Sequence, residues 1–260
     1  MWAIALALFL SAKSITLSGL LHSHACARRS RLFAYSFLWP GMDARTFCSD
    51  GAVTRPRVGE WVLVGAKTLA GVALVWGAVP FAGATRPLVT GWIGMVGIVF
   101  LLHFGFFHLL SLLWRSYGVD ARPIMQLPAA ATSLSRFWGG KWNAAFTDLM
   151  RDHCFKPLKR YIGARAALFL VFLISGVLHE MVISLPAHGG YGLPTMYFCT
   201  QALGLLFERS KLGRRIGLGS GWKGWCFVAL VAGLTAFWLF HPVFVHNVVL
   251  PMLHAIGAMR

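Results

Sequence analysis

Charge is scarce in this chain of 260 residues, and acidic charge is the scarcest. Only 12% of the residues are charged, whereas 57% are hydrophobic. A soluble globular domain has about a quarter charged residues and about half apolar residues. The composition therefore excludes an ordinary soluble domain and predicts an integral membrane protein.

The few charges are mostly of one sign. Eight Asp and Glu residues stand against 24 Lys and Arg residues, which gives a formal net charge of +16. Such an excess is typical of nucleic-acid binding, but here the charges fall between apolar segments and form no separate basic domain. Anionic lipid head groups, or a polyanionic cosubstrate at the membrane surface, explain them better. We expect no nucleic-acid partner.

Several common motifs are missing as well. The five cysteines are scattered without CxxC spacing, so they predict neither a disulfide framework nor a zinc site. There is no G-x-S-x-G nucleophile elbow and no P-loop. The first 21 residues lack a basic start and a small-residue cleavage site, so we interpret them as a membrane span and not as a signal peptide.

What the chain has in abundance is apolar segments of spanning length. We identify six, at Trp2–Leu21, Glu60–Ala82, Leu88–Trp114, Ala164–Leu185, Tyr191–Phe207 and Trp222–Phe240. A seventh, Pro242–Ala258, is short and contains polar residues, so it fits a tilted span, a half-helix or a re-entrant piece. No internal repeat is visible. We expect an all-α, polytopic bundle of about six to eight spans that forms a single domain over residues 1–260.

The basic residues alternate between the predicted loops. The segment 22–59 has six Lys or Arg residues, 115–163 has eight and 208–221 has four, whereas the loops between them have one or none. Positively charged loops stay on the cytoplasmic side. We therefore expect these three loops to be cytoplasmic, in a multi-pass protein of a bacterial inner membrane or the endoplasmic reticulum.

The segment 115–163 is too long for a plain connector and too polar to span the membrane. Around 133–160 it has an aromatic and apolar face interleaved with basic residues, which is typical of an amphipathic helical segment lying in the membrane interface. Ser133 or Ser135 is a suitable cap for its start, and Pro157 should end or kink it. An ordinary solvated helix face is the alternative interpretation.

His179 and Glu180 lie near the end of the apolar segment Ala164–Leu185. An ionisable group at membrane depth is costly and marks a functional site by default. The alternative is a histidine that only satisfies a polar neighbour in the bundle.

Metal sites are the first function to weigh, because the chain has ten histidines. His103 and His108 have the spacing of one histidine box of a membrane di-iron desaturase or hydroxylase, but paired-histidine boxes are absent, and residues five apart on an α-helix point about 140° away from each other. His179-Glu180 lacks the second histidine of H-E-x-x-H. His22, His24 and Cys26 resemble an interface feature more than a zinc site. We expect no metal.

The remaining chemistry is that of a base beside apolar walls. A neutral His179 is suited to deprotonating the hydroxyl of a lipid-like acceptor. Asn143 is placed to donate a hydrogen bond to a carbonyl or to the oxyanion formed on it. Lys and Arg residues are suited to holding the phosphates of an activated donor. These residue types indicate group transfer onto a membrane-dissolved alcohol.

Two linked motifs carry a resemblance to a known family. Arg136-Phe-Trp-Gly-Gly-Lys-Trp-Asn143, followed by Arg151-Asp-His-Cys-Phe-Lys-Pro157, resembles the F-W-x-x-W-N and H-x-Y-x-P region of membrane-bound O-acyltransferases. Phe172-Leu-Ile-Ser-Gly-Val-Leu-His179-Glu180 resembles the catalytic-histidine helix of that family. The stretch Leu38-Trp-Pro-Gly-Met-Asp43 is similar to the wax-synthase-like branch. The resemblance covers mainly residues 115–210, with weaker support near 35–60.

The resemblance implies an acyl-CoA-dependent O-acyltransferase of the wax-ester-synthase kind, with His179 as general base and Asn143 assisting. Acyl-CoA is then the cosubstrate, no cofactor is needed, and the acceptor is a lipophilic alcohol. We expect Glu180 to orient the site, because it points about 100° away from His179 on a helix. The residues expected to contact substrates are Trp138, Trp142, Glu180, Gln201, Arg151 and Lys156.

Two features depart from the family pattern. Family members are usually longer, with eight or more spans, and Phe155 stands where a tyrosine is common. A transporter and a di-iron hydroxylase are the rival functions. The acceptor, the acyl length and the oligomeric state cannot be deduced from the residues.

Overall fold

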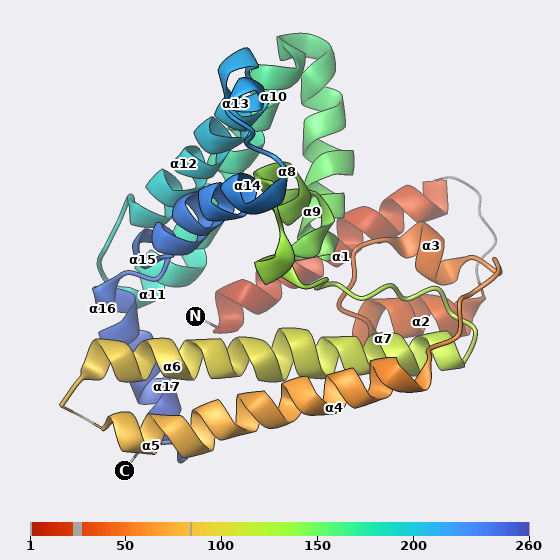
Figure 1. The fold of residues 1–260 in the computed structure, drawn as a ribbon. Coiled ribbons are helices and arrows are strands. Elements are labelled where there is room, and N and C mark those ends of the chain that lie inside the picture. The colour runs from red at the N-terminus through yellow and green to blue at the C-terminus, as the bar shows by residue number, and fades with distance from the viewer. Residues whose placement is uncertain (1, 23–27, 84, 260) are drawn as a thin grey trace. The chain divides into compact units, whose positions relative to one another are not determined.

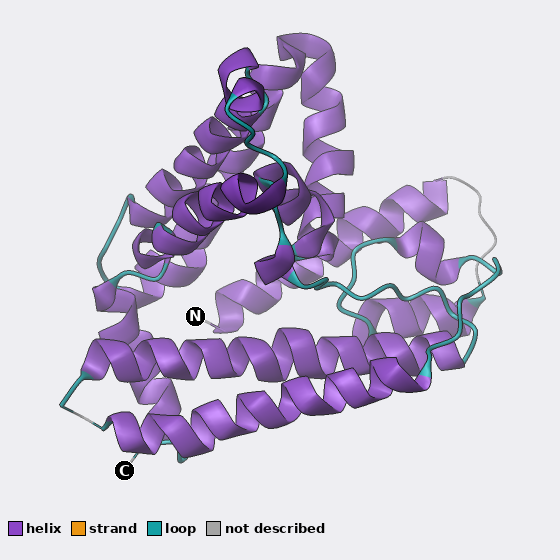
Figure 2. Cartoon of the chain, viewed as in Figure 1, coloured by secondary structure: helices purple, strands orange, loops and turns teal. Residues whose placement is uncertain are grey.

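The structure is a computed structural model, which describes residues 2–22, 28–83 and 85–259. His24 and Cys26, two of the three residues in the predicted interface cluster, lie outside these residues. Every regular element in the described part of the chain is a helix (Figure 2). This confirms the predicted all-α class.

The chain divides into two compact units. One comprises Met1–Leu6 and Gln126–Val248, and the other comprises Ala7–Met125 and Val249–Arg260. The first contains His179 and Asn143 and is called the histidine unit below; the second is called the N-terminal unit. The expectation of a single domain stays a prediction.

Within the described residues, five helical runs are long and apolar enough to cross a membrane: Trp2–His22, Val58–Ala82, Pro87–Ser116, Ala144–Ala187 and Gly221–Leu239. Each contains or closely matches one expected span. The remaining expected span, Tyr191–Phe207, forms α12 (Leu193–Glu208), which has 16 residues and is shorter than the other five. The seventh is a shorter apolar helix, Pro242–Ala255.

The N-terminal unit is built on two long helical runs. One consists of α4 (Val58–Val72), the π-helix η1 (Ala73–Ala78) and α5 (Val79–Ala82); the other consists of α6 (Pro87–Val99), the π-helix η2 (Phe100–Phe106) and α7 (Phe107–Ser116). The two runs pack alongside each other (Figure 1). The unit is completed by α1 (Trp2–His22, from Ala7 on), α2 (Arg29–Leu38), α3 (Ala44–Cys48) and α17 (Leu250–Ala255).

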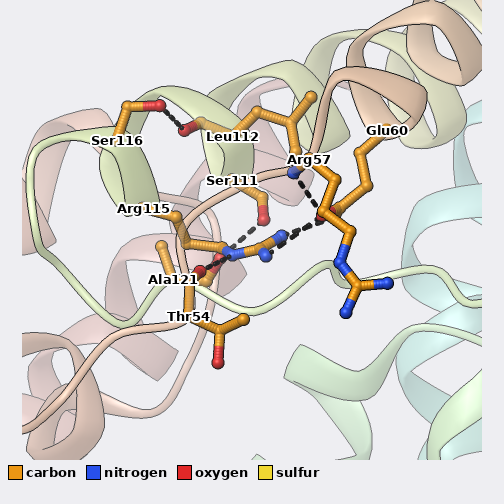
Figure 3. Close-up of polar contacts among 8 residues, drawn as sticks. All are labelled: Thr54, Arg57, Glu60, Ser111, Leu112, Arg115, Ser116 and Ala121. Atoms are coloured by element: carbon orange, nitrogen blue, oxygen red, sulfur yellow. Dashed lines mark hydrogen bonds and ion pairs between the residues drawn. The ribbon is translucent and has the colours of Figure 1, made fainter.

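An ion pair ties the two long runs together near one end (Figure 3). Arg115 of α7 donates to both carboxylate oxygens of Glu60 of α4, at 2.7 and 3.3 Å, and its Nε donates to the carbonyl of Thr54 at 3.0 Å. The backbone N–H of Arg57 donates to Glu60 Oε1. A bidentate Arg–carboxylate pair fixes orientation as well as distance.

The histidine unit begins with short helical pieces. These are η3 (Pro128–Ala130), α8 (Leu134–Arg136), the π-helix η4 (Phe137–Lys141), α9 (Ala144–Met150) and the π-helix η5 (Arg151–Phe155). They continue into α10 (Lys156–His179), the π-helix η6 (Glu180–Ser184) and α11 (Leu185–Ala187). The unit ends with α12, α13 (Lys211–Arg215), α14 (Gly221–Val228), η7 (Ala229–Leu234), α15 (Ala236–Leu239), α16 (Pro242–Phe244) and η8 (Val245–Val249, to Val248).

The predicted amphipathic segment 133–160 is helical but broken. Ser133 caps its start, as expected, by accepting the N–H of Arg136 at 3.0 Å. The backbone leaves the helix at Trp142, which is extended, and at Asn143, which has a left-handed φ of 43°. The sequence period alone does not reveal this interruption.

Pro157 was predicted to end or kink the helix, and the helix does not end there. Pro157 lies in the first turn of α10, directly after a π-turn, where a missing N–H costs least. The backbone instead leaves the helical conformation at Gly163, with φ 77° and ψ 166°. Glycine adopts this conformation without steric cost. The uninterrupted helix that follows begins at residue 164, where the span was expected to begin.

The helices α10 and α12 share the most extensive contact between elements of the histidine unit, and they lie side by side (Figure 1). A Cβ atom placed on Gly176 of α10 would lie 2.7 Å from the Cα atom of Thr195 in α12. Only glycine permits this approach, because the obstructing atom belongs to the backbone. The contact fixes how α12 presents its side chains to α10.

We predict that Gly176→Ala lowers the thermal stability of the detergent-solubilised protein, because overpacking of a tight contact costs about 1–3 kcal/mol. The matched control is Gly233→Ala, since a Cβ atom there meets nothing within 4 Å. Thermal unfolding curves of the two variants and the unmodified chain measure the effect. Equal midpoints for both variants would contradict the close packing.

Candidate active site

The ring of His179 has a defined tautomer. His179 is the last residue of α10, and its Nδ1 atom lies 2.7 Å from the carbonyl oxygen of Ser175. A carbonyl oxygen only accepts hydrogen bonds, so Nδ1 carries the proton. In the neutral ring Nε2 is then the basic nitrogen, and it has no hydrogen-bond partner within the described part of the chain.

Two aromatic rings border the imidazole of His179. The Phe198 ring of α12 has its centroid 4.4 Å from that of the imidazole, and the Phe146 ring of α9 stands edge-on at 6.3 Å. Phe198 is buried and His179 is half-buried. The basic nitrogen therefore belongs to a ring held between two helices in apolar surroundings.

Asn143 begins the helix that brings Phe146 to His179. Its Oδ1 atom accepts the backbone N–H of Phe146 at 3.2 Å and so caps α9. Asparagine is one of the few residues that adopt the left-handed conformation found here. Asn143 is thus linked to His179 through Phe146, whose backbone N–H it binds and whose ring contacts the imidazole. The predicted role of Asn143 at the oxyanion is not tested by this geometry.

The two predicted tryptophans differ in their surroundings. Trp138 packs its ring against Phe172, Tyr197 and Phe198, so it shares the Phe198 contact with His179. Trp142 stacks on Phe137, with ring planes 7° apart and centroids 5.8 Å apart. Trp138 is therefore part of the aromatic cluster around the histidine, whereas Trp142 braces the preceding turn.

Gln201 is fully buried and uses all of its polar atoms. Its Oε1 accepts the indole N–H of Trp138 at 3.3 Å, and its Nε2 donates to the carbonyl of Val231 at 2.7 Å and to Thr235 Oγ1 at 3.2 Å. This side chain ties Trp138 and α12 to the helix η7. The substrate contact of Gln201 stays a prediction. Its observed hydrogen bonds hold Trp138 and η7 in place against α12.

Glu180 holds the start of α12. Its Oε1 accepts both the backbone N–H and the hydroxyl of Thr195, at 3.0 and 2.9 Å. Its Oε2 is buried and has no hydrogen-bond partner among the described residues. A carboxylate at a helix N-terminus also interacts favourably with the helix dipole. These bonds fit the orienting role predicted for Glu180.

A buried histidine that the sequence did not single out lies next to this region. His241 is fully buried; its Nδ1 accepts the N–H of Phe244 at 3.1 Å, so its Nε2 carries the proton, 3.3 Å from Ser184 Oγ. Ser184 Oγ also lies 3.3 Å from the carbonyl of Gly190. Burial lowers the pKa of His241, and the Glu180 carboxylate opposes this shift. The one sequence signal was the position before Pro242, typical of a helix cap.

Arg151 and Lys156 lie on the exposed side of η5 and the start of α10, and both are ion-paired. Arg151 contacts Asp148 at 2.7 Å and Asp152 at 3.1 Å, and Lys156 contacts Asp152 at 2.7 Å. Exposed pairs of this kind contribute about 0–1 kcal/mol, so a phosphate can displace them. The predicted phosphate-binding charges are present, but two carboxylates that the sequence argument overlooked neutralise them.

One argument against a di-iron site assumed that His103 and His108 lie on a regular α-helix. His103 lies within a π-helix and His108 follows it closely, and a π-turn closes i→i+5, so residues five apart are roughly one turn apart. The value of about 140° was calculated for an α-helix and therefore does not apply across η2. No group of three or more His, Cys, Asp or Glu side chains that could hold a metal ion occurs within residues 2–22, 28–83 and 85–259.

The N-terminal unit contains an apolar hollow of about 420 Å³. It is lined partly by Trp39 and Pro40, from the stretch that is similar to wax synthases, and by Trp114 and Tyr117 at the end of α7. No acidic or basic side chain lines it. The hollow can accommodate apolar groups but provides no general base.

Comparison with known proteins gives matches to the part of the chain that contains His179. Residues 121–200 match the family described as "Membrane bound O-acyl transferase family". The chain is 26% identical over 148 residues to the probable long-chain-alcohol O-fatty-acyltransferase 7 of Arabidopsis thaliana, which covers 50% of the chain and 42% of that relative. It is 26% identical over 143 residues to the long-chain-alcohol O-fatty-acyltransferase of Simmondsia chinensis, covering 50% and 40%.

A third match is shorter than these two but has a higher sequence identity. The probable long-chain-alcohol O-fatty-acyltransferase 3 of Arabidopsis thaliana is 34% identical over 80 residues, covering 28% of the chain and 23% of that relative. The matched regions thus span less than half the length of these curated relatives. Residues 121–200 are thus similar to the membrane-bound O-acyltransferase family, and parts of the chain are similar to long-chain-alcohol O-fatty-acyltransferases.

Proposed function

We propose that the protein is an acyl-CoA-dependent O-acyltransferase that esterifies a membrane-dissolved alcohol, with His179 as the general base. The observation that carries the proposal is the tautomer of His179, whose Nδ1 is bound to Ser175 and whose Nε2 is left as the base. The family match and the names of the similar proteins support this reaction class. Long-chain alcohols are the proposed acceptors, because those names specify them.

The proposed reaction begins at Nε2 of His179. Nε2 of His179 takes the proton of the acceptor hydroxyl as the oxygen attacks the thioester carbonyl carbon. The carbon–sulfur bond then breaks, and the leaving CoA thiolate recovers a proton from the imidazolium. The Nδ1–Ser175 hydrogen bond keeps the ring oriented through both transfers. The products are the ester and free CoA, and no cofactor takes part.

Asn143 is the proposed partner at the oxyanion. The cap to Phe146 fixes its carbonyl oxygen, which orients the side-chain amide nitrogen. A fixed donor near a developing negative charge lowers the barrier because it needs no reorganisation during the reaction. Trp138 and Phe198 then serve as apolar walls for the acyl chain or the acceptor.

The donor is proposed to bind at the basic surface of η5 and α10. Arg151 and Lys156 exchange their carboxylate partners for phosphates of acyl-CoA. The basic loops 22–59, 115–163 and 208–221 are proposed to face the cytoplasm, since positively charged loops stay on that side. Acyl-CoA then arrives from the cytoplasm, and the alcohol arrives from the membrane.

We predict that His179→Asn lowers the rate of acyl transfer by about 10²-fold or more, because general-base catalysis is lost. The purified variant is incubated with labelled acyl-CoA and a panel of long-chain alcohols, sterols and diacylglycerols, and the products are read by mass spectrometry. The control is His188→Asn, an exposed histidine with a left-handed φ of 55° that asparagine tolerates. Full activity of His179→Asn would reject the assignment.

We predict that Arg151→Gln together with Lys156→Gln raises the KM for acyl-CoA several-fold with little change in kcat, because ground-state binding of the phosphates is lost. Asp152→Asn should act in the opposite direction and lower that KM, since it releases Lys156 from its carboxylate and removes one of the two carboxylates that Arg151 contacts. Steady-state kinetics at fixed ionic strength measure both effects. An unchanged KM in all variants would show that CoA binds elsewhere.

A further inference from the structure

We propose that the N-terminal unit contains a binding site for the carboxylate or phosphate head group of an amphipathic lipid, formed by Lys67 and His108 between α4 and α7. The site is independent of the acyl-transfer reaction and uses none of its residues. It gives a role to His108, which the proposed function leaves without one.

The two long helical runs pack tightly at the proposed site. A Cβ atom on Gly105 of η2 would lie 2.7 Å from Thr68 Oγ1 of α4. Lys67 directly precedes Thr68, and its ammonium lies 5.6 Å from the centre of the Phe104 ring. π-helical turns such as η2 occur frequently at functional sites.

Lys67 is a cation without an anionic partner. It is half-buried, and within the described part of the chain it makes no hydrogen bond and no ion pair. It lies nine residues after Val58, the first residue of α4, which corresponds to about 14 Å along the helix axis. A charged residue at such a depth in a span marks a functional site by default.

His108 is a second unsatisfied group, four residues after Phe104, whose ring the Lys67 ammonium faces. Only 8% of its surface is exposed, and neither ring nitrogen has a hydrogen-bond partner among the described residues. Buried polar atoms are normally hydrogen-bonded, because an unmade bond costs about 1–3 kcal/mol. Nδ1 of His103 is likewise buried without a partner. These atoms indicate a ligand that supplies the missing bonds.

The local charge decides the chemistry of that ligand. His108 interacts electrostatically with Lys67, Glu60 and Arg115. Glu60 is already bound to both terminal nitrogens of Arg115, as Figure 3 shows, so its charge is matched there and Lys67 is left over. An excess positive charge repels a metal cation and attracts an anion. The ammonium and the imidazole N–H provide donors for carboxylate or phosphate oxygens.

The surroundings indicate that this anion belongs to a lipid. Leu63 lies four residues before Lys67 on α4, and so on the same helix face, with its apolar side chain exposed. An amphiphile with a single chain satisfies Lys67 and His108 with its head group and covers this apolar surface with its chain. Free phosphate has the same head-group chemistry without the chain, so a direct comparison distinguishes the two sources.

The test measures binding to the purified full chain in detergent by native mass spectrometry. The probes are oleate, oleoyl lysophosphatidate, neutral monooleoylglycerol and inorganic phosphate. We expect at least one anionic amphiphile to bind about tenfold or more tightly than monooleoylglycerol, and Lys67→Gln and His108→Asn each to remove that preference. Lys67→Arg should retain it. Retention of phosphate alone, lost in the same variants, would support the anion site with free phosphate as its source.

The matched control is Arg55→Gln, which removes one exposed positive charge from the same unit. Thermal unfolding identifies variants that fail to fold, and the comparison of charged and neutral probes on the unmodified chain needs no variant. Equal binding of oleate, lysophosphatidate and monooleoylglycerol without phosphate binding would overturn the proposal. An anionic preference that survives Lys67→Gln, or that disappears equally in Arg55→Gln, would overturn it as well.

Discussion

The contact between α10 and α12 is the constraint on which the arrangement around His179 depends. Glycine at position 176 lets the two backbones meet, and Glu180 then binds the first turn of α12 through Thr195. With that turn fixed, Phe198 reaches the imidazole and Gln201 reaches Trp138. The carboxylate next to the histidine in the sequence thus acts on it through a neighbouring helix.

Buried polar groups, and not apolar packing alone, specify the histidine unit. Glu208 is buried at the end of α12, and it accepts the backbone N–H groups of Leu134 and Ser135 at 2.6 and 3.1 Å. At the start of α12, the Glu180 carboxylate accepts the N–H of Thr195. At the other end of α12, the Glu208 carboxylate accepts free N–H groups at the start of α8. In an apolar environment such bonds are strongly directional, because an unpaired group has no water to replace its partner.

Much of this fold follows from local sequence signals, and the exceptions have a physical reason. Apolar length predicts the spanning runs, and Ser133 is the cap that its residue type suggests. Gly163 was missed because a positive φ depends on the path of the chain, whereas Pro157 was misjudged because proline is harmless in a first turn. The π-turns also escaped prediction, since they leave the apolar pattern of a helix almost unchanged.

The candidate site was predictable where its chemistry lies close in sequence and not where it depends on packing. His179 and Trp138 share one aromatic neighbour, which spacing cannot show. The carboxylate partners of Arg151 and Lys156 are only one to four residues away, so they were available to sequence reasoning. His241 is the opposite case, because 57 residues separate it from Ser184.

The π-turn after His179 makes the length of this segment matter more than its composition. A turn of this type contains one residue more than an α-turn, so η6 shifts the phase of every later position by about 100°. Ser184, the last residue of η6, lies 3.3 Å from Nε2 of His241. The apolar residues Met181, Val182 and Ile183 should therefore tolerate exchange for other apolar side chains, whereas a single insertion or deletion there would rotate the end of the helix out of register.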